Sequence, residues 1–390
     1  MNNWKHAQKV LILLALITAP AILFPKTPQE ALLIVHGTFS KDAEWFTENG
    51  EFQTQVQKSV KKTSKKIKAI PFVWSGQPHY QARINAAIKL AEKIISLKDL
   101  KKLFIVGHSH GCNVVAFASI LLELAAMDKK SADRKQKLII KRVREIAFEE
   151  HLTGKTVLQS AWLDEWKNGL VKLMGYWNYT LKKTQTVLSK LKLNKIANFV
   201  ANTSYGVESA KTILEMLQSE DSDQTYAQTR ELENTVTNAV SRLKILLEQN
   251  NLSTHQLTIK PLINSAFLLA CPVDDIASYP SPKIIKKAYN LYSHADLVQR
   301  VFGIYKRRFE NNNSNVINIP VVIKESRKAE TIRHPGHNDM HNPCIARWLF
   351  YLPNLFMNRS SDMDSTCCAE FYEDFARPQI VLKQLKTRSL

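Results

Sequence analysis

Short apolar runs alternate along the chain with helical patterns, and this alternation constrains the fold more than any other feature. Runs rich in Val, Ile, Leu and Phe occur at Ala31–Val35, Lys66–Trp74, Lys102–Val106, Ser265–Cys271, Ala288–Tyr292 and Val316–Ile323. Continuous apolar character is typical of strands buried on both faces of a parallel sheet. Because parallel strands need crossover connections, the pattern predicts an α/β fold with a mostly parallel sheet of about six strands and helices on both faces.

The segments between the first three runs fit this prediction. Ala43–Lys65 and Ala82–Leu97 are amphipathic, and a strongly apolar helical segment ends near Ala126. Pro320 lies inside the last run and lacks a backbone N–H for a sheet ladder. It therefore favours an edge position for that strand.

The stretch from Met127 to about Gln256 contains no strand-like run, only Lys-rich helical patterns such as Val187–Val200 and Glu208–Leu217. The predicted organisation is a core of residues 26–126 and 257–352, interrupted by a basic helical insertion at 127–256. No structure is predicted for the tail, residues 353–390.

The N-terminus carries Lys5 and Lys9 ahead of an apolar run from Val10 to Phe24, with small residues near Ala19. The run is short for a spanning helix and suits the core of a secretory signal. Residues 1–25 are predicted to be a signal peptide or an N-terminal membrane anchor, with a buried helix as the alternative. Either of the first two predicts a secreted, periplasmic or membrane-anchored protein.

The chain has 54 Lys and Arg against 35 Asp and Glu, a formal charge of +19. Such a charge favours anionic partners. No nucleic-acid-binding motif is present, so an anionic membrane surface is the expected partner and nucleic acid is not. Lysines interleaved with apolar residues could lie on such a surface; the alternative is a solvated basic face. The first basic cluster consists of Lys129, Lys130, Arg134, Lys135, Lys137, Lys141, Arg142 and Arg144. The second consists of Lys182, Lys183, Lys190, Lys192 and Lys195.

Five cysteines are too few and too scattered for a disulfide framework. Cys112 and Cys271 lie in apolar runs, where a free thiol behaves as a small hydrophobe. The adjacent Cys367 and Cys368 could pair with other cysteines in an oxidising compartment.

The run Gly107-His108-Ser109-His110-Gly111 matches G-x-S-x-G and stands between a buried strand and the apolar helical segment. A sharp strand-to-helix turn of this kind holds a nucleophilic serine in a strained conformation, and the flanking Gly107 and Gly111 let neighbouring backbone pass closely. Ser109 is therefore the predicted nucleophile. The alternative is an ordinary turn bounded by glycines.

This strand–turn–helix context resembles the nucleophile elbow of α/β-hydrolases. His36-Gly37-Thr38-Phe39, after the first strand, resembles the His-Gly turn of lipases and esterases in that superfamily. The resemblance implies an oxyanion hole built from backbone N–H groups of His110 and of Thr38 or Phe39. A structural turn with a capping Thr is the alternative. The resemblance covers about 31–126 and 257–350. In this superfamily a helical insertion usually forms a cap or lid over the active site, so the resemblance implies that role for residues 127–256. This chain lacks the two leading strands that many members have, as compact bacterial lipases also do.

In α/β-hydrolases the acid follows the serine along the chain and orients the base, which comes last. Asp296 follows the penultimate strand and is the preferred acid. Asp274 and Asp275, after the preceding strand, are its rivals. Helix capping is the alternative role for all three.

His337, in a Gly-His loop after the last strand, is the preferred base, with His341 as the second choice. The cluster of His334, His337, Asp339 and His341 could also ligate zinc. The serine elbow would leave such a metal without a role in the chemistry. No metal and no organic cofactor are therefore expected.

The resemblance implies hydrolysis of carboxylic esters, lipids among them, through an acyl-enzyme with a Ser-Asp-His triad. A thioesterase or amidase would use the same residues. The alternative from a different class is a catalytically idle hydrolase fold that binds a partner or a membrane.

Overall fold

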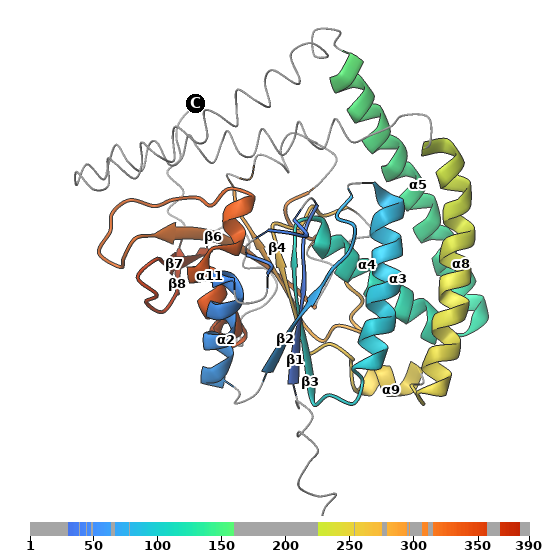
Figure 1. Cartoon of the computed structure of the whole chain (residues 1–390), viewed down its shortest axis with the longest axis horizontal. Coiled ribbons are helices and arrows are strands. Elements are labelled where there is room, and N and C mark those ends of the chain that lie inside the picture. Colours follow the sequence, from blue (N-terminus) through green and yellow to red (C-terminus); the bar gives the residue numbers. More distant parts are fainter. Residues whose placement is uncertain are drawn as a thin grey trace, which may run out of the picture.

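A computed structural model describes the sheet, its covering helices and both ends of the insertion (Figure 1). The described residues are 30–38, 40–43, 45–47, 50–63, 67–77, 79–159, 225–252, 254–274, 279–294, 296, 306–310, 315–356 and 367–382.

All six predicted strands are present. They are β1 (Glu30–Val35), β2 (Ile67–Phe72), β3 (Lys102–His108), β4 (Ser265–Leu269), β5 (Ala288–Tyr292) and β6 (Val316–Lys324). The sheet has eight strands in the order β2-β1-β3-β4-β5-β6-β7-β8. The strands from β2 to β7 in this order pair in parallel with one another. The last strand, β8, pairs antiparallel with β7. The predicted α/β class with a mostly parallel sheet is confirmed, while the count of six strands was too low.

The two additional strands come from the C-terminal tail, for which the sequence predicted no structure. They are β7 (Cys367–Tyr372) and β8 (Gln379–Leu382). β7 was missed because it carries a carboxylate: Glu370 is buried and pairs with Lys324 of β6 at 3.0 Å. The edge position predicted for β6 is wrong, since β6 lies between β5 and β7. Pro320 pairs on the β5 side only, and the register with β7 begins at Val321.

Two layers of helices cover the sheet (Figure 1), as strand β1 illustrates. Ala31, Leu33 and Val35 contribute to the core beneath α3 (Tyr80–Ser96) and α4 (His110–Ala126). Leu32 and Ile34 contribute to the core beneath α2 (Glu51–Thr63) and α11 (Pro343–Trp348). Alternate side chains of one strand therefore fill both faces, which explains the continuous apolar runs. The remaining short helices are α9 (Thr254–Ile259), η2 (Asn338–His341), η3 (Leu349–Tyr351) and α12 (Leu352–Leu355).

Both described ends of the predicted insertion are helical, α5 (Lys129–Gln159) and α8 (Thr225–Gln249). They pack outside α3 and α4 (Figure 1), and Leu232, Val236 and Leu243 of α8 join the same apolar core. The ends of the insertion thus belong to the core of the domain. Residues 160–224, with the predicted helices Val187–Val200 and Glu208–Leu217, lie outside the described residues.

Helix α5 runs back toward the carboxyl ends of the strands. Lys135 near its start pairs with Glu123 near the end of α4 at 2.6 Å, and Arg144 pairs with Glu233 of α8 at 2.7 Å. α5 continues from Arg144 to Gln159, which is about 22 Å of helix at 1.5 Å per residue. The end of α5 and the start of α8, which flank residues 160–224, therefore lie toward the end of the sheet at which the parallel strands finish.

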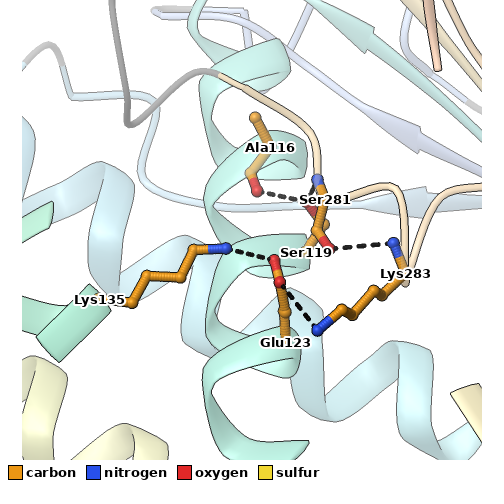
Figure 2. A network of polar contacts seen from close by, with 6 residues as sticks. All are labelled: Ala116, Ser119, Glu123, Lys135, Ser281 and Lys283. Atoms are coloured by element: carbon orange, nitrogen blue, oxygen red, sulfur yellow. Dashed lines mark hydrogen bonds and ion pairs between the residues drawn. The ribbon is translucent and has the colours of Figure 1, made fainter. Parts of the chain in front are cut away.

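A polar network around the buried Glu123 fixes the first turns of α5 to α4 and to the loop before β5 (Figure 2). Glu123 accepts a hydrogen bond from Lys135 and lies 3.6 Å from the Nζ atom of Lys283, while Ser119 accepts one from the Ser281 backbone at 2.9 Å. Burial opposes ionisation of Glu123, but the bond and charge of Lys135, helped by Ser281 and Lys283, outweigh it and lower its pKa. The carboxylate therefore stays charged and holds these three segments together.

Basic residues of the first predicted cluster are partly neutralised within the protein. Lys135, Lys141, Arg142 and Arg144 all form ion pairs with glutamates. The second basic cluster lies outside the described residues, so an anionic surface as partner stays a prediction. Among the described helices, none combines the length and apolar character needed to cross a bilayer. The predicted signal or anchor, residues 1–25, lies outside the described part of the chain.

The predicted burial of Cys112 and Cys271 is confirmed, and neither forms a disulfide with a described cysteine. Cys368 of β7 is also buried and outside any disulfide with a described cysteine. Nothing is described of the Cys367 side chain.

Candidate active site

Ser109 occupies a strained turn between β3 and α4. Its backbone angles are φ 52° and ψ −131°, a region that L-residues rarely adopt. Two backbone hydrogen bonds hold the turn: the Ser109 N–H donates to Leu269 of β4 and its carbonyl accepts from Cys112, both at 2.9 Å. The predicted strand–turn–helix context is therefore present, and the neighbouring strand and helix stabilise the strained serine.

Two glycines let the first strand approach this turn. A Cβ on Gly111 would lie 2.4 Å from the carbonyl oxygen of His36 and 2.6 Å from that of Val35. A Cβ on Gly37 would lie 2.8 Å from the Cβ of Ser109. Gly107 has similar constraints, with Cys112 backbone at 3.0 Å. The predicted role of glycine at these positions is thus explained by close backbone approach.

The turn after β1 is held by His36. The backbone N–H of Trp74 donates to His36 Nε2 at 3.2 Å, so the proton of the neutral ring is on Nδ1, which donates to the Gly37 carbonyl at 2.7 Å. The Trp74 indole donates in turn to the His36 carbonyl at 2.8 Å. Burial lowers the pKa of His36. Thr38 is buried, and Phe39 lies outside the described residues.

The preferred base and acid lie together. His337 Nδ1 is 2.9 Å from an Asp296 carboxylate oxygen, and both side chains are at most 3% exposed. The carboxylate fixes the Nδ1–H tautomer and leaves a lone pair on Nε2. Within the described part of the chain, that Nε2 atom has no hydrogen-bond partner. His337 thus has an unoccupied acceptor, which a general base requires.

His337 lies beside the serine turn. Its carbonyl accepts a hydrogen bond from His108 Nε2 at 3.0 Å, and the two rings are 5.1 Å apart between centroids. His108 and His110 flank Ser109, and burial together with the proximity of His337 lowers the pKa of both rings. The fold therefore brings the predicted nucleophile, base and acid to one end of the parallel sheet, although they are far apart in sequence.

The rival acid Asp274 has a different partner. It is buried at the end of β4 and accepts a hydrogen bond from the Tyr80 hydroxyl of α3. The other rival, Asp275, lies outside the described residues. Of the described carboxylates, Asp296 is the one hydrogen-bonded to His337.

The loop that carries His337 is braced by the C-terminal tail. Asp339 accepts from the Gly336 N–H at 3.1 Å and from Arg333 at 2.9 Å, and Arg333 also donates to Glu373, just after β7, at 2.9 Å. Trp348 of α11 donates to the Phe375 carbonyl at 3.2 Å. Residues that follow β7 therefore help to position the candidate base.

Sequence reasoning missed a buried cation next to His110. Arg83 of α3 is 2% exposed, and its guanidinium lies 2.8 Å from His110 Nδ1 and 4.0 Å from the centre of the Tyr80 ring. A guanidinium only donates, so Nδ1 of His110 must be an acceptor. Burial, then the charges of Arg83 and His337, hold the His110 pKa well below its usual value. The sequence feature that could have indicated this site is a charged residue, Arg83, on the same helix face as the apolar Ala87, Leu90 and Ile94.

His341, the second choice as base, packs within an aromatic cluster. Its ring stacks on Trp45 with centroids 4.8 Å apart and meets the His108 ring at 5.1 Å. Burial, reinforced by His337, lowers the pKa of His341 to about 3. His341 is therefore a half-buried histidine that is neutral at neutral pH.

This burial predicts a loss of stability in acid. Between the ordinary histidine pKa near 6.5 and the folded value of about 3, the unfolded chain binds one more proton at His341 than the folded chain. The free energy of unfolding should therefore fall as the pH decreases through this window, by up to about 1.4 kcal/mol per pH unit for one such histidine. Urea unfolding at several pH values measures this slope.

A His341→Gln variant should have a shallower slope than the wild type, whereas His255→Gln, at an exposed position of α9, should not. Equal slopes for wild type and His341→Gln would contradict a lowered pKa of His341 in the folded protein.

Within the described residues, no three His, Cys, Asp or Glu side chains converge to hold a metal ion. His337 and Asp339 of the proposed zinc cluster instead bond to Asp296 and Arg333.

The arrangement combines a strained serine, an oriented imidazole and a buried carboxylate, which together can deprotonate a hydroxyl for nucleophilic attack. Comparisons with protein-family models, with curated proteins and with solved structures found no match to this chain.

Proposed function

We propose that the protein is a serine hydrolase of the α/β-hydrolase type that cleaves carboxylic esters through an acyl-enzyme. The observation that carries this proposal is the His337–Asp296 pair at 2.9 Å, in a loop that contacts the strained serine turn through His108. Among the described residues, Nε2 of His337 has no hydrogen-bond partner. A buried carboxylate on Nδ1 keeps the proton off Nε2, so that Nε2 is ready to accept one from a serine.

In the proposed reaction, Ser109 Oγ attacks the ester carbonyl carbon while its proton moves to Nε2 of His337. The carbonyl electron pair becomes an oxyanion, which backbone N–H groups of His110 and of Thr38 or Phe39 stabilise. When the carbonyl re-forms, the alcohol leaves with the proton from Nε2. Water, deprotonated by the same nitrogen, then hydrolyses the acyl-Ser109 ester.

The α5–α8 pair supports a cap made by the insertion. Both helices connect residues 160–224 to the carboxyl edge of the sheet, where Ser109 lies. We propose that this segment selects the substrate, and that the substrates include lipids presented at an anionic surface.

A fluorophosphonate probe on the purified full chain tests the chemistry, because it phosphonylates only an activated serine. The wild type should be labelled and Ser109→Ala should not. Ser96→Ala, at the exposed end of α3, is the matched control and should be labelled like the wild type. An unlabelled but folded wild type, or equal labelling of Ser109→Ala, would refute the proposal.

A substrate panel then separates the related activities. Turnover of short soluble esters, dispersed long-chain esters, thioesters and anilides is compared with and without anionic vesicles. Faster turnover of dispersed esters on vesicles is the result expected for a lipid-surface enzyme. A preference for thioesters or anilides would replace the esterase assignment without affecting the nucleophile.

A further inference from the structure

Arg83 is a buried cation that takes no part in the proposed reaction. It belongs to α3 and is 2% exposed, and α3 packs against α4, the helix that begins directly after Ser109. Burying a charged group is strongly unfavourable unless the group forms good hydrogen bonds. The contacts that Arg83 makes at this depth therefore indicate why the fold retains it.

The guanidinium of Arg83 lies between its own helix and the nucleophile turn. It stacks on Tyr80, one turn earlier on α3, at 4.0 Å from the centre of the ring. Its Nη1 atom lies 2.8 Å from Nδ1 of His110, the residue that directly follows the nucleophile. A guanidinium only donates hydrogen bonds, and a charged donor forms stronger ones than a neutral donor.

This contact decides which nitrogen of His110 carries the proton. Oδ1 of Asn113 also lies near Nδ1 of His110, at 3.3 Å, and the Asn113 amide is oriented because its Nδ2 donates to the Pro272 carbonyl at 3.0 Å. A proton on Nδ1 could be donated to Asn113, but it would face the hydrogens of Arg83. The bond from Arg83 is shorter and charge-assisted, so Nδ1 is the acceptor and the neutral ring carries its proton on Nε2.

His110 is the first residue of α4, and its position matters because the preceding turn is strained. Ser109 has φ 52°, and such strain persists only where the surrounding structure holds it. A backbone bond from Ser109 to Leu269 holds the turn from β4, and one from Cys112 to Ser109 holds it from within α4. The bond from Arg83 adds a third hold, from α3, on the next residue along the chain.

We infer that Arg83 is a positioning residue of the nucleophile turn, which fixes the His110 ring in one orientation and one tautomer. The inference rests on the proposed function, in which the backbone N–H of His110 stabilises the oxyanion beside Ser109. Arg83 acts through His110 and forms no bond to the substrate. Its guanidinium keeps all its protons throughout the reaction.

Two variants of the full chain test this inference with a short soluble ester. Arg83→Met removes the donor and the charge, whereas Arg83→Lys retains both. A misplacement of about 1 Å near a reacting group can lower the rate by about 10²-fold. We expect a kcat about 10²-fold lower for Arg83→Met, with KM changed by less than about threefold, and a kcat within about tenfold of the wild type for Arg83→Lys.

Arg242→Met is the matched control. Arg242 of α8 also reaches α3, but from the solvent side, where it pairs with Glu92 at 3.0 Å. Its kcat should equal that of the wild type. Near-ultraviolet circular dichroism and urea midpoints check that every variant is folded under the conditions of the assay.

Nitrogen NMR of protein with ¹⁵N-labelled histidine gives a readout that a merely structural role would not change. In the wild type, the His110 signals should show a bare Nδ1 and a protonated Nε2. In Arg83→Met, the proton should move to Nδ1, which can then donate to Asn113. Loss of one set of signals in His110→Gln assigns them.

The outcomes separate this inference from the proposed function. A wild-type His110 with its proton on Nδ1 would overturn the inference without any variant, and an unchanged tautomer in Arg83→Met would also overturn it. So would a kcat of Arg83→Met within about threefold of a wild type that shows Ser109-dependent probe labelling, or equal losses in Arg83→Met and Arg83→Lys. Absence of Ser109-dependent labelling in a folded wild type would overturn both.

Discussion

Replacing Asp296 by Asn should lower kcat for ester hydrolysis by about 10⁴-fold while the protein stays folded. In the wild type, the buried carboxylate holds the His337 proton on Nδ1 across a distance of 2.9 Å. An Asn amide can donate to Nδ1 instead, which stabilises the tautomer with its proton on Nε2. That tautomer cannot accept the serine proton, and the corresponding change in serine proteases has about this effect. Steady-state kinetics with a short ester measures it.

Asp274→Asn is the matched control, since Asp274 is an equally buried carboxylate at the end of the neighbouring strand β4. Asp274 accepts a hydrogen bond from the Tyr80 hydroxyl and not from His337, so kcat should stay within about tenfold of the wild type. Near-ultraviolet circular dichroism checks the fold of both variants. If Asp274→Asn reduced kcat more than Asp296→Asn did, Asp296 would not be the acid of the triad.

Gly111→Ala should prevent the chain from reaching a stable folded state. The added methyl group would lie 2.4 Å and 2.6 Å from two backbone carbonyl oxygens at the end of β1, and central strands cannot shift to relieve such a contact. We expect a loss of about 4 kcal/mol or more in the free energy of unfolding, against a total of about 5–15 kcal/mol for ordinary domains. Soluble yield and the urea midpoint measure it.

Gly336→Ala is the comparison for this variant. Gly336 precedes His337, yet the nearest atom to an added Cβ is a carboxylate oxygen of Asp339 at 3.7 Å, an ordinary contact. The free energy of unfolding of Gly336→Ala, obtained from its urea midpoint, should differ from that of the wild type by less than about 1 kcal/mol. A Gly111→Ala protein as stable as Gly336→Ala would mean that β1 and α4 are not as close as described.

The framework of the site could be predicted because each of its main residues follows a recognisable strand. Ser109, Asp296 and His337 come after β3, β5 and β6, and the carboxyl ends of parallel strands meet at one edge. Their order along the chain then suggested their roles. The structure brings them together as this reasoning expected, while the chemical roles stay predictions.

Other parts of the site gave weaker signals. Tyr80 and Arg83 lie on a helix whose periodicity is that of any amphipathic helix, and only their depth in the fold brings them to Asp274 and His110. β7 escaped prediction because the buried Glu370 pairs with Lys324, and such pairing is set by tertiary contacts.

The brace between Glu373, Arg333 and the loop of His337 also sets an order of events during synthesis. The serine turn is synthesised before the loop of His337, and Glu373 is added later still, after β7. Until Glu373 has been added, that loop lacks its outer brace. In the proposed enzyme, the base would therefore be secured only after β7 has been made.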